Sequence, residues 1–182
     1  MQRIMRTSRF VSLLVVTLVV MAVSPCFGGE KEFKGQGRKT IEEFKKTDPE
    51  MAKFFNSAYG YAVFPTVGKG GFGIGAARGR GLVYERGTMV GETILTQVTI
   101  GAQLGGQTYS EVVFLEDKST MNSFKRGNFA LSAQASAVAA ASGASANAKY
   151  KQGVAVFTMA ISGLMYEASV GGQQFHFLPP EK

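Results

Sequence analysis

Glycine falls on alternate positions in the stretch that most limits how this chain can fold, residues 69–87. From Gly71 to Gly75 every second residue is glycine with apolar residues between, and the spacing returns at Gly79 and Gly81. A period of two is the spacing of an extended strand, in which alternate residues share one face. A face made of glycine has no side chains, so another layer of chain or a ligand can approach the backbone closely. We therefore expect a glycine-lined strand pair at the centre of the fold.

Four cations are distributed along the same stretch: Lys69, Arg78, Arg80 and Arg86. In the expected strand pair they stand at the strand ends and in the turn, which predicts a basic rim. The stretch is not a dinucleotide-binding loop, because Gly-x-Gly-x-x-Gly counted from Gly73 has Arg78 in place of the third glycine. No helical period follows it either.

The first 28 residues have the order of a secretory signal peptide: three arginines, an apolar run over residues 10–23, and small residues before Gly28. Cleavage after Gly28 would leave no cysteine, and therefore no disulfide or thiolate metal site. Lipidation of Cys26 is the alternative, although Pro25 beside the cut disfavours it. Either route predicts export, to the periplasm or to the outer membrane.

The net charge narrows the range of partners. Removal of the three signal-peptide arginines lowers the 20 cations of the chain to 17 against 13 acids, so the net charge falls from +7 to +4. A mildly basic chain is compatible with an anionic surface but does not require one. An exported chain without a basic run is not expected to bind nucleic acid.

After the signal peptide, residues 29–39 read as a flexible lead, and a single domain is expected over residues 40–182. Thr40 and Glu43 have the spacing of a capping box, and residues 47–50 give a second helix start. One apolar helical stripe follows, formed by Met51, Phe54, Phe55, Ala58 and Tyr59. Lys45, Lys46 and Lys53 lie around the polar side and are candidate lipid-binding residues. The stripe either packs on the core or meets a membrane surface.

The remaining chain reads mainly as strand. Runs rich in β-branched and aromatic residues, separated by glycine, cover residues 61–64, 69–82, 93–102, 109–115, 153–159, 162–170 and 173–178. A helical turn is expected from Asp117 or Ser119 to Gly127. Residues 129–148 alternate small residues in a way that favours a strand, but their alanines leave a helix open. The predicted fold class is α+β: a mainly antiparallel sheet of about seven to nine strands, as a sandwich or partly closed barrel, with one or two N-terminal amphipathic helices packed on it.

Few residues suit catalysis. His176 alternates with two phenylalanines in the last strand, where an edge or surface position explains it. The two aspartates, Asp48 and Asp117, stand at helix starts where capping explains them. Four glutamates are scattered along strands and turns without forming a recognisable pair, and no nucleophile or metal-ligand spacing is present. We expect no enzyme and no cofactor.

Several motifs in order resemble the SYLF-domain family. They are Ala58-Tyr59-Gly60-Tyr61-Ala62-Val63-Phe64-Pro65, Lys69-Gly70-Gly71-Phe72-Gly73-Ile74-Gly75, Gly81-Leu82-Val83-Tyr84, Ile100-Gly101-Ala102-Gln103-Leu104-Gly105-Gly106-Gln107, Phe129-Ala130-Leu131-Ser132-Ala133 and Gly153-Val154-Ala155-Val156-Phe157 with Gly163-Leu164. Each motif alone is weak, but the ordered set is specific and covers roughly residues 40–178.

The resemblance implies lipid binding by the helix over residues 51–59, including Phe54 and Phe55, together with Lys69. The eukaryotic members bind phosphoinositide membranes and some bind actin, partners that an exported bacterial chain does not meet in its own cell. Anionic phospholipid head groups remain, and Arg78, Arg80 and Arg86 are added on physical grounds alone. The alternatives are a small outer-membrane β-barrel and a domain that binds another envelope protein.

Overall fold

The computed structural model describes residues 29–127, 129–132, 135–162 and 170–180. The predicted signal peptide with Cys26, and most of the strand predicted over residues 162–170, lie outside them. The elements in order are α1 (Glu30–Thr47), a short 3-10 helix η1 (Pro49–Met51), α2 (Ala52–Ser57), β1 (Gly60–Glu85), β2 (Thr88–Leu115), α3 (Lys118–Lys125), β3 (Phe129–Ala130), β4 (Val138–Ala139), β5 (Val154–Ser162) and β6 (Gln174–Leu178).

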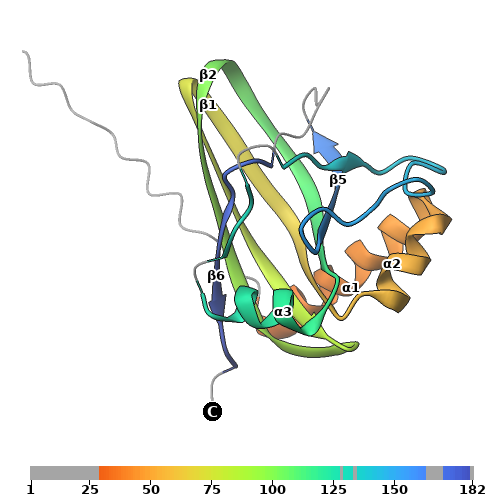
Figure 1. Ribbon diagram of the computed structural model, residues 1–182. Helices are drawn as coiled ribbons and strands as arrows, with labels where there is room; N and C mark the ends of the chain where they lie inside the picture. The colour runs from red at the N-terminus through yellow and green to blue at the C-terminus, as the bar shows by residue number, and fades with distance from the viewer. Residues whose placement is uncertain (1–28, 128, 133–134, 163–169, 181–182) are drawn as a thin grey trace, which may run out of the picture.

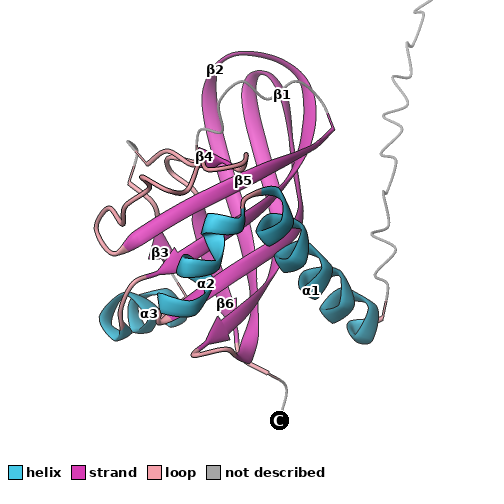
Figure 2. Ribbon diagram, turned by 90° about the vertical axis from the view of Figure 1, so that its right-hand side faces the viewer, coloured by secondary structure: helices cyan, strands magenta, loops and turns pink. Residues whose placement is uncertain are grey.

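A single long hairpin organises the fold. β1 and β2 pair antiparallel along their whole length, from Gly60 opposite Leu115 to Glu85 opposite Thr88. Both strands turn back on themselves near their middle, as nested inverted-U ribbons at one end of the molecule (Figure 2). Several strands that the sequence suggested as separate are therefore halves of these two. We call this turn of the ribbon the bend end.

The glycines explain how the ribbon can fold over. At the bend, a Cβ on Gly71 would lie 2.5 Å from the Cα of Gly75, so a side chain there would collide with the backbone. Further along β1, a Cβ on Gly81 would lie 2.6 Å from the ring of Phe64, on the other half of the same strand. The expectation that a glycine face admits another layer of chain is confirmed at this position.

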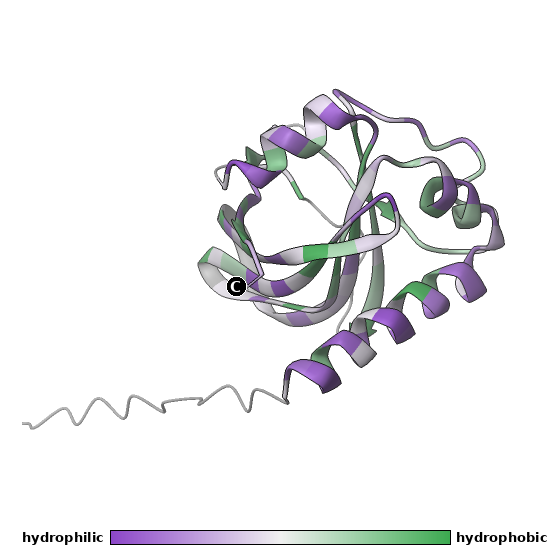
Figure 3. Cartoon of the chain, turned by 90° about the horizontal axis from the view of Figure 1, so that it is seen from below, coloured by the Kyte–Doolittle hydropathy of each residue, from purple (hydrophilic) through white to green (hydrophobic). Residues whose placement is uncertain are grey.

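The two halves of β2 carry different neighbours. Its first half pairs with β6 and its second half with β5, and the two-residue strands β3 and β4 extend the edges. One six-stranded sheet results, with β1 joined to β2 alone. The strands curl around an interior, with α1 running outside them (Figure 3). The predicted fold class, a mainly antiparallel and partly closed sheet with N-terminal helices, is confirmed.

Two apolar cores hold the sheet. The first fills the inside of the curl, where Phe64 and Phe175 meet Met121 and Phe124 of α3. The second lies between the outer face of the sheet and the N-terminal helices, with Phe54 packed on Phe114 and Phe157. The hairpin turn and α3 lie at the end of the molecule opposite the bend (Figure 1).

Residues 30–39 are not a flexible lead, which corrects the sequence prediction. They form the first half of α1, where Lys34 pairs with Glu30 one turn away. Gly37 is buried so closely against Leu82 that an added Cβ would lie 2.3 Å from the Leu82 side chain. Contacts with distant β1 residues thus stabilise a segment whose charged and glycine-containing composition suggests disorder.

Of the predicted helix starts, those at Asp48 and Asp117 are confirmed and the one at Thr40 is wrong. Thr40 is no N-cap: it lies within α1, and its hydroxyl donates to the Gln36 carbonyl at 3.0 Å. Asp48 does cap η1, and Asp117 caps α3 by accepting from the Thr120 N–H at 2.8 Å. Residues 129–148 are neither a continuous strand nor a helix, because apart from β3 and β4 their described part is irregular.

Candidate functional site

The four cations of the glycine-rich stretch do not form one rim. Lys69 lies opposite Gln107, beside the bend, and Arg78 lies opposite Thr96 on the strand that descends from it. Arg80 is one pleat repeat further along. Arg86 occupies the tight turn between β1 and β2 with φ of 50°. Eight residues of strand span about 26 Å, so Arg86 in the hairpin turn lies far from Arg78, which is nearer the bend.

Arg80 is engaged within the fold. Its Nε and Nη2 donate to the two carboxylate oxygens of Glu92 at 2.6 and 2.8 Å, a bidentate pair across β1 and β2. Its guanidinium also lies 4.3 Å from the ring centroid of Phe33 in α1. Bidentate pairing and stacking fix the guanidinium in orientation. Arg80 therefore joins α1 to the sheet, and its predicted place in an anion-binding rim is corrected.

The helical stripe packs on the core rather than facing outward. Phe54 is buried, and the half-buried Phe55 ring makes edge contacts with Tyr61 and Phe114. Lys45 and Lys53 stand over the rings of Phe55 and Phe54, with nitrogens 4.9 and 5.5 Å from the centroids.

Two of the lysines predicted around the stripe differ in their contacts. Lys53 donates to the Ala146 carbonyl at 2.8 Å, and Lys46 is exposed. Of the two interpretations of the stripe, the structure supports core packing.

The bend end carries an exposed apolar patch that the sequence analysis did not single out. Ile74 is 64% exposed and Val98 is 71% exposed, and the strand register makes them diagonal neighbours on the outer face. Ile161, at the nearby end of β5, is 54% exposed. Alternation of the same strand places Arg78 on the face of Ile74, two pleat repeats from it. We call Ile74, Val98 and Arg78 the bend patch.

Lys69 differs from the other cations in its surroundings. It is partly buried, and desolvation lowers the pKa of its ammonium, while the Glu111 carboxylate acts in the opposite sense. A lysine of this kind covers apolar surface with its methylene stem and keeps its nitrogen at the boundary. Lys69 alternates with the core residue Val67, so its side chain lies on the inner face of the ribbon, opposite to Ile74, Val98 and Arg78.

The inside of the curl holds a buried carboxyl group. Glu111 is completely buried, and its Oε2 accepts from Gln173 Nε2 at 3.0 Å. The same Gln173 nitrogen lies 3.5 Å from the Tyr109 hydroxyl oxygen. Burial raises the pKa of Glu111 to about 8, since the charged form loses its hydration. Sequence reasoning missed this group because nothing local distinguishes Glu111 from the other scattered glutamates.

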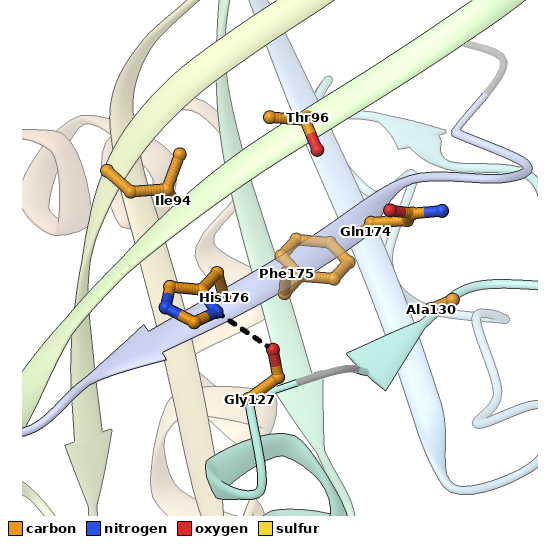
Figure 4. Close-up of a pocket in the computed structure, with 7 residues that line it drawn as sticks. All are labelled: Ile94, Thr96, Gly127, Ala130, Gln174, Phe175 and His176. Carbon is orange, nitrogen blue, oxygen red and sulfur yellow. Dashed lines mark hydrogen bonds between the residues drawn. The ribbon is translucent and has the colours of Figure 1, made fainter.

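A second polar position lies on the outer face of β2 and β6. A groove of about 420 Å³ there is lined by Ile94, Thr96, Gly127, Ala130, Gln174, Phe175 and His176 (Figure 4). His176 is exposed, as the sequence predicted, and its Nδ1 lies 3.1 Å from the Gly127 carbonyl oxygen. No carboxylate lines this groove, so His176 has no acid partner there.

No group of three or more His, Cys, Asp or Glu side chains in the described part of the chain is placed to hold a metal ion. Nor does any helix within it combine the length and the apolar content needed to cross a bilayer.

Comparisons with known proteins agree with the resemblance drawn from the motifs. Residues 96–177 match the Ysc84 family model, described as "Las17-binding protein actin regulator". The chain is also 29% identical over 129 residues to Beta cell expansion factor A of Aeromonas veronii, an alignment covering 70% of this chain and 49% of that protein. The chain thus spans about half the length of the curated relative it matches.

Proposed function

Because the chain belongs to the SYLF-domain (Ysc84) family, we propose that it is a non-enzymatic module that binds anionic phospholipid head groups at a membrane surface. The observation that carries the proposal is the bend patch, where two exposed apolar side chains and the cation Arg78 share the outer face at one end of the fold. Exposed apolar side chains that adjoin one another are a common mark of surfaces that contact membranes or partners.

The arrangement of the bend patch suits an interface between hydrocarbon and water. Ile74 and Val98 would enter the head-group boundary, while Arg78 reaches from the same face to the phosphates. Transferring two side chains that are each about two-thirds exposed gives about 1–2 kcal/mol apiece. Each cation near an anionic leaflet adds about 1 kcal/mol. Binding of this size is weak, reversible and sensitive to salt.

Several residues that the sequence predicted to bind lipid are not part of the proposed membrane-binding surface. Phe54 and Phe55 pack in the second core, and Arg80 holds α1 against the sheet. Lys45 and Lys53 interact with the rings beneath them. Lys69 lies on the inner face of the ribbon, and Arg78 remains as the charged member of the bend patch.

Location follows from the N-terminal sequence and is part of the same proposal. We place the protein in the bacterial periplasm or at the outer membrane, through the predicted signal peptide over residues 1–28. Mass spectrometry of the mature N-terminus would test this. A mature chain that begins at Gly29 indicates simple export, whereas one that begins at an acylated Cys26 indicates an anchored lipoprotein.

Flotation with vesicles tests the surface itself. We expect the wild-type protein to float with vesicles of phosphatidylglycerol and phosphatidylcholine, and to do so less at high salt. The Arg78→Glu and Ile74→Ser/Val98→Ser variants should each bind at least about tenfold more weakly. Arg86→Glu is the matched control, since this exposed arginine lies at the opposite end and should bind like wild type.

Two results would contradict this proposal. Equal flotation of all variants would remove the role of the bend patch. Absence of flotation for the wild-type chain, with recovery of a specific envelope protein by crosslinking through position 74 or 98, would favour the protein-binding alternative.

A further inference from the structure

A cavity of about 760 Å³ lies between β5 and the irregular segment that precedes it. We call the described residues 131–132 and 135–152 the strap. Its floor includes Val154 and Val156, which are buried on one face of β5, and its far wall includes the small side chains of Ala135 and Ala148. The cavity is separate from the bend patch, since none of the bend-patch residues lines it.

The strap is held over β5 at fixed points. The Ala140 N–H donates to the Thr158 carbonyl at 2.7 Å, beside the short pairing of β4 with β5. Further along, the Ser145 N–H donates to the buried Asp48 carboxylate at 2.7 Å. The strap residues Ser132, Ala135, Ser136 and Ala148 line the cavity, and their small side chains do not fill it. The cavity is thus a consequence of firm anchors combined with small residues.

The mouth of the cavity is positively charged. Lys149 and Lys151 line it and are exposed, and no carboxylate is among the lining residues. Among the described residues, neither lysine takes part in a salt bridge within 4.0 Å. A tight turn fixes Lys151, because its N–H and carbonyl exchange bonds of 2.8 and 3.0 Å with Val154.

We propose that this cavity binds one acyl chain that ends in an anionic head group, such as a fatty acid or a lysophospholipid. Ligand sites are typically cavities of about 300–1,000 Å³ with mostly apolar walls and a few orienting polar groups. The chain would lie on Val154 and Val156, with its carboxylate or phosphate at Lys149 and Lys151. An added peptide strand suits the site less well, because Val154 already bonds Lys151 with both backbone groups.

This inference goes beyond membrane-surface binding: it concerns one amphiphile in a cavity. The probe is a dansyl-labelled fatty acid, whose fluorescence rises in an apolar site, titrated below its critical micelle concentration. Oleate and lysophosphatidylglycerol should both displace it. Uncharged monoolein should compete at least about threefold less well, since it lacks the charge that the lysines recognise.

Two variants test the placement. Ser136 is exposed and lines the cavity, so Ser136→Phe should fill the space without disturbing a buried contact, and saturable probe binding should be lost. Lys149→Glu/Lys151→Glu should weaken oleate binding about three- to tenfold. The control is Lys31→Glu/Lys46→Glu on α1, which changes the net charge equally and should bind like wild type.

Urea unfolding would verify that each variant is folded, and flotation separates this inference from the proposed function. Ser136→Phe should float with vesicles like wild type. The proposal is wrong if the wild-type chain shows no saturable probe binding, or if folded Ser136→Phe binds the probe normally. Preferential displacement by oleate would identify a fatty-acid site, and preferential displacement by lysophosphatidylglycerol a lysolipid site.

Discussion

The buried carboxyl group of Glu111 makes a sharp prediction about stability and pH. Its Oε2 accepts one hydrogen bond from Gln173, and its Oε1 has no hydrogen-bond partner among the described residues. Burial raises the pKa from 4.5 to about 8. An acid whose pKa is higher in the folded state stabilises the fold when protonated, and this stabilisation is lost as the pH rises toward about 8.

The size of the effect follows from linkage. Between the unfolded pKa of 4.5 and the folded pKa of about 8, the folded protein holds one proton that the unfolded chain has released. The free energy of unfolding should therefore fall by about 1.4 kcal/mol per pH unit in this window. From pH 5 to pH 8 the expected loss is on the order of 3 kcal/mol, a large share of the stability of a small domain.

Urea unfolding at pH 5, 6.5 and 8 would measure this loss. In Glu111→Gln the amide is neutral at every pH, so the loss assigned to this group should disappear and the variant should exceed wild type at pH 8. Glu116→Gln removes an exposed carboxylate one residue beyond the same strand and should keep the wild-type slope. If Glu111→Gln and wild type lose the same stability between pH 5 and pH 8, the buried-acid reasoning is incorrect.

Two further predictions concern the hairpin. Gly81→Val should destabilise the protein by about 1–3 kcal/mol in urea unfolding, because the new side chain would collide with the Phe64 ring, whereas Gly68→Ala in open space should change stability by less than about 1 kcal/mol. A normal unfolding midpoint for Gly81→Val would show that the two halves of β1 are not closely packed. Arg80→Leu should lower stability by about 1–2 kcal/mol through loss of the Glu92 pair while vesicle binding stays unchanged; reduced flotation of this folded variant would return Arg80 to the lipid-binding surface.

Local patterns predicted much of the secondary structure. The alternation of glycine predicts an extended chain, and the close approach at Gly81 follows from the absence of a side chain. The stripe that contains Met51 and Phe54 predicts the helical turns that pack on the sheet. Asp48 and Asp117 predict the starts of η1 and α3. These features depend on residues within a few positions of one another, so a single sequence carries them.

The candidate site was predicted only in part. Arg78 lies on the outer face near the bend, but Lys69 lies on the inner face, and Arg80 is engaged with Glu92 twelve positions along the chain. The exposure of Ile74 and Val98 depends on where the ribbon turns, and periodicity gives both residues the same pattern as buried strand residues. The site therefore needed the tertiary structure.

By itself the sequence determined the strand periods, the apolar helical stripe, the capping residues and the family, because each is expressed in neighbouring residues or in ordered motifs. The tertiary structure alone decided that the hairpin folds back on itself, that α1 begins at Glu30, and that Glu111 lies inside the curl. It also decided that Asp48 holds Ser145, 97 residues away, and so shapes the strap. Such contacts join residues far apart in the sequence, and they depend on how the whole chain packs to bury its apolar surface.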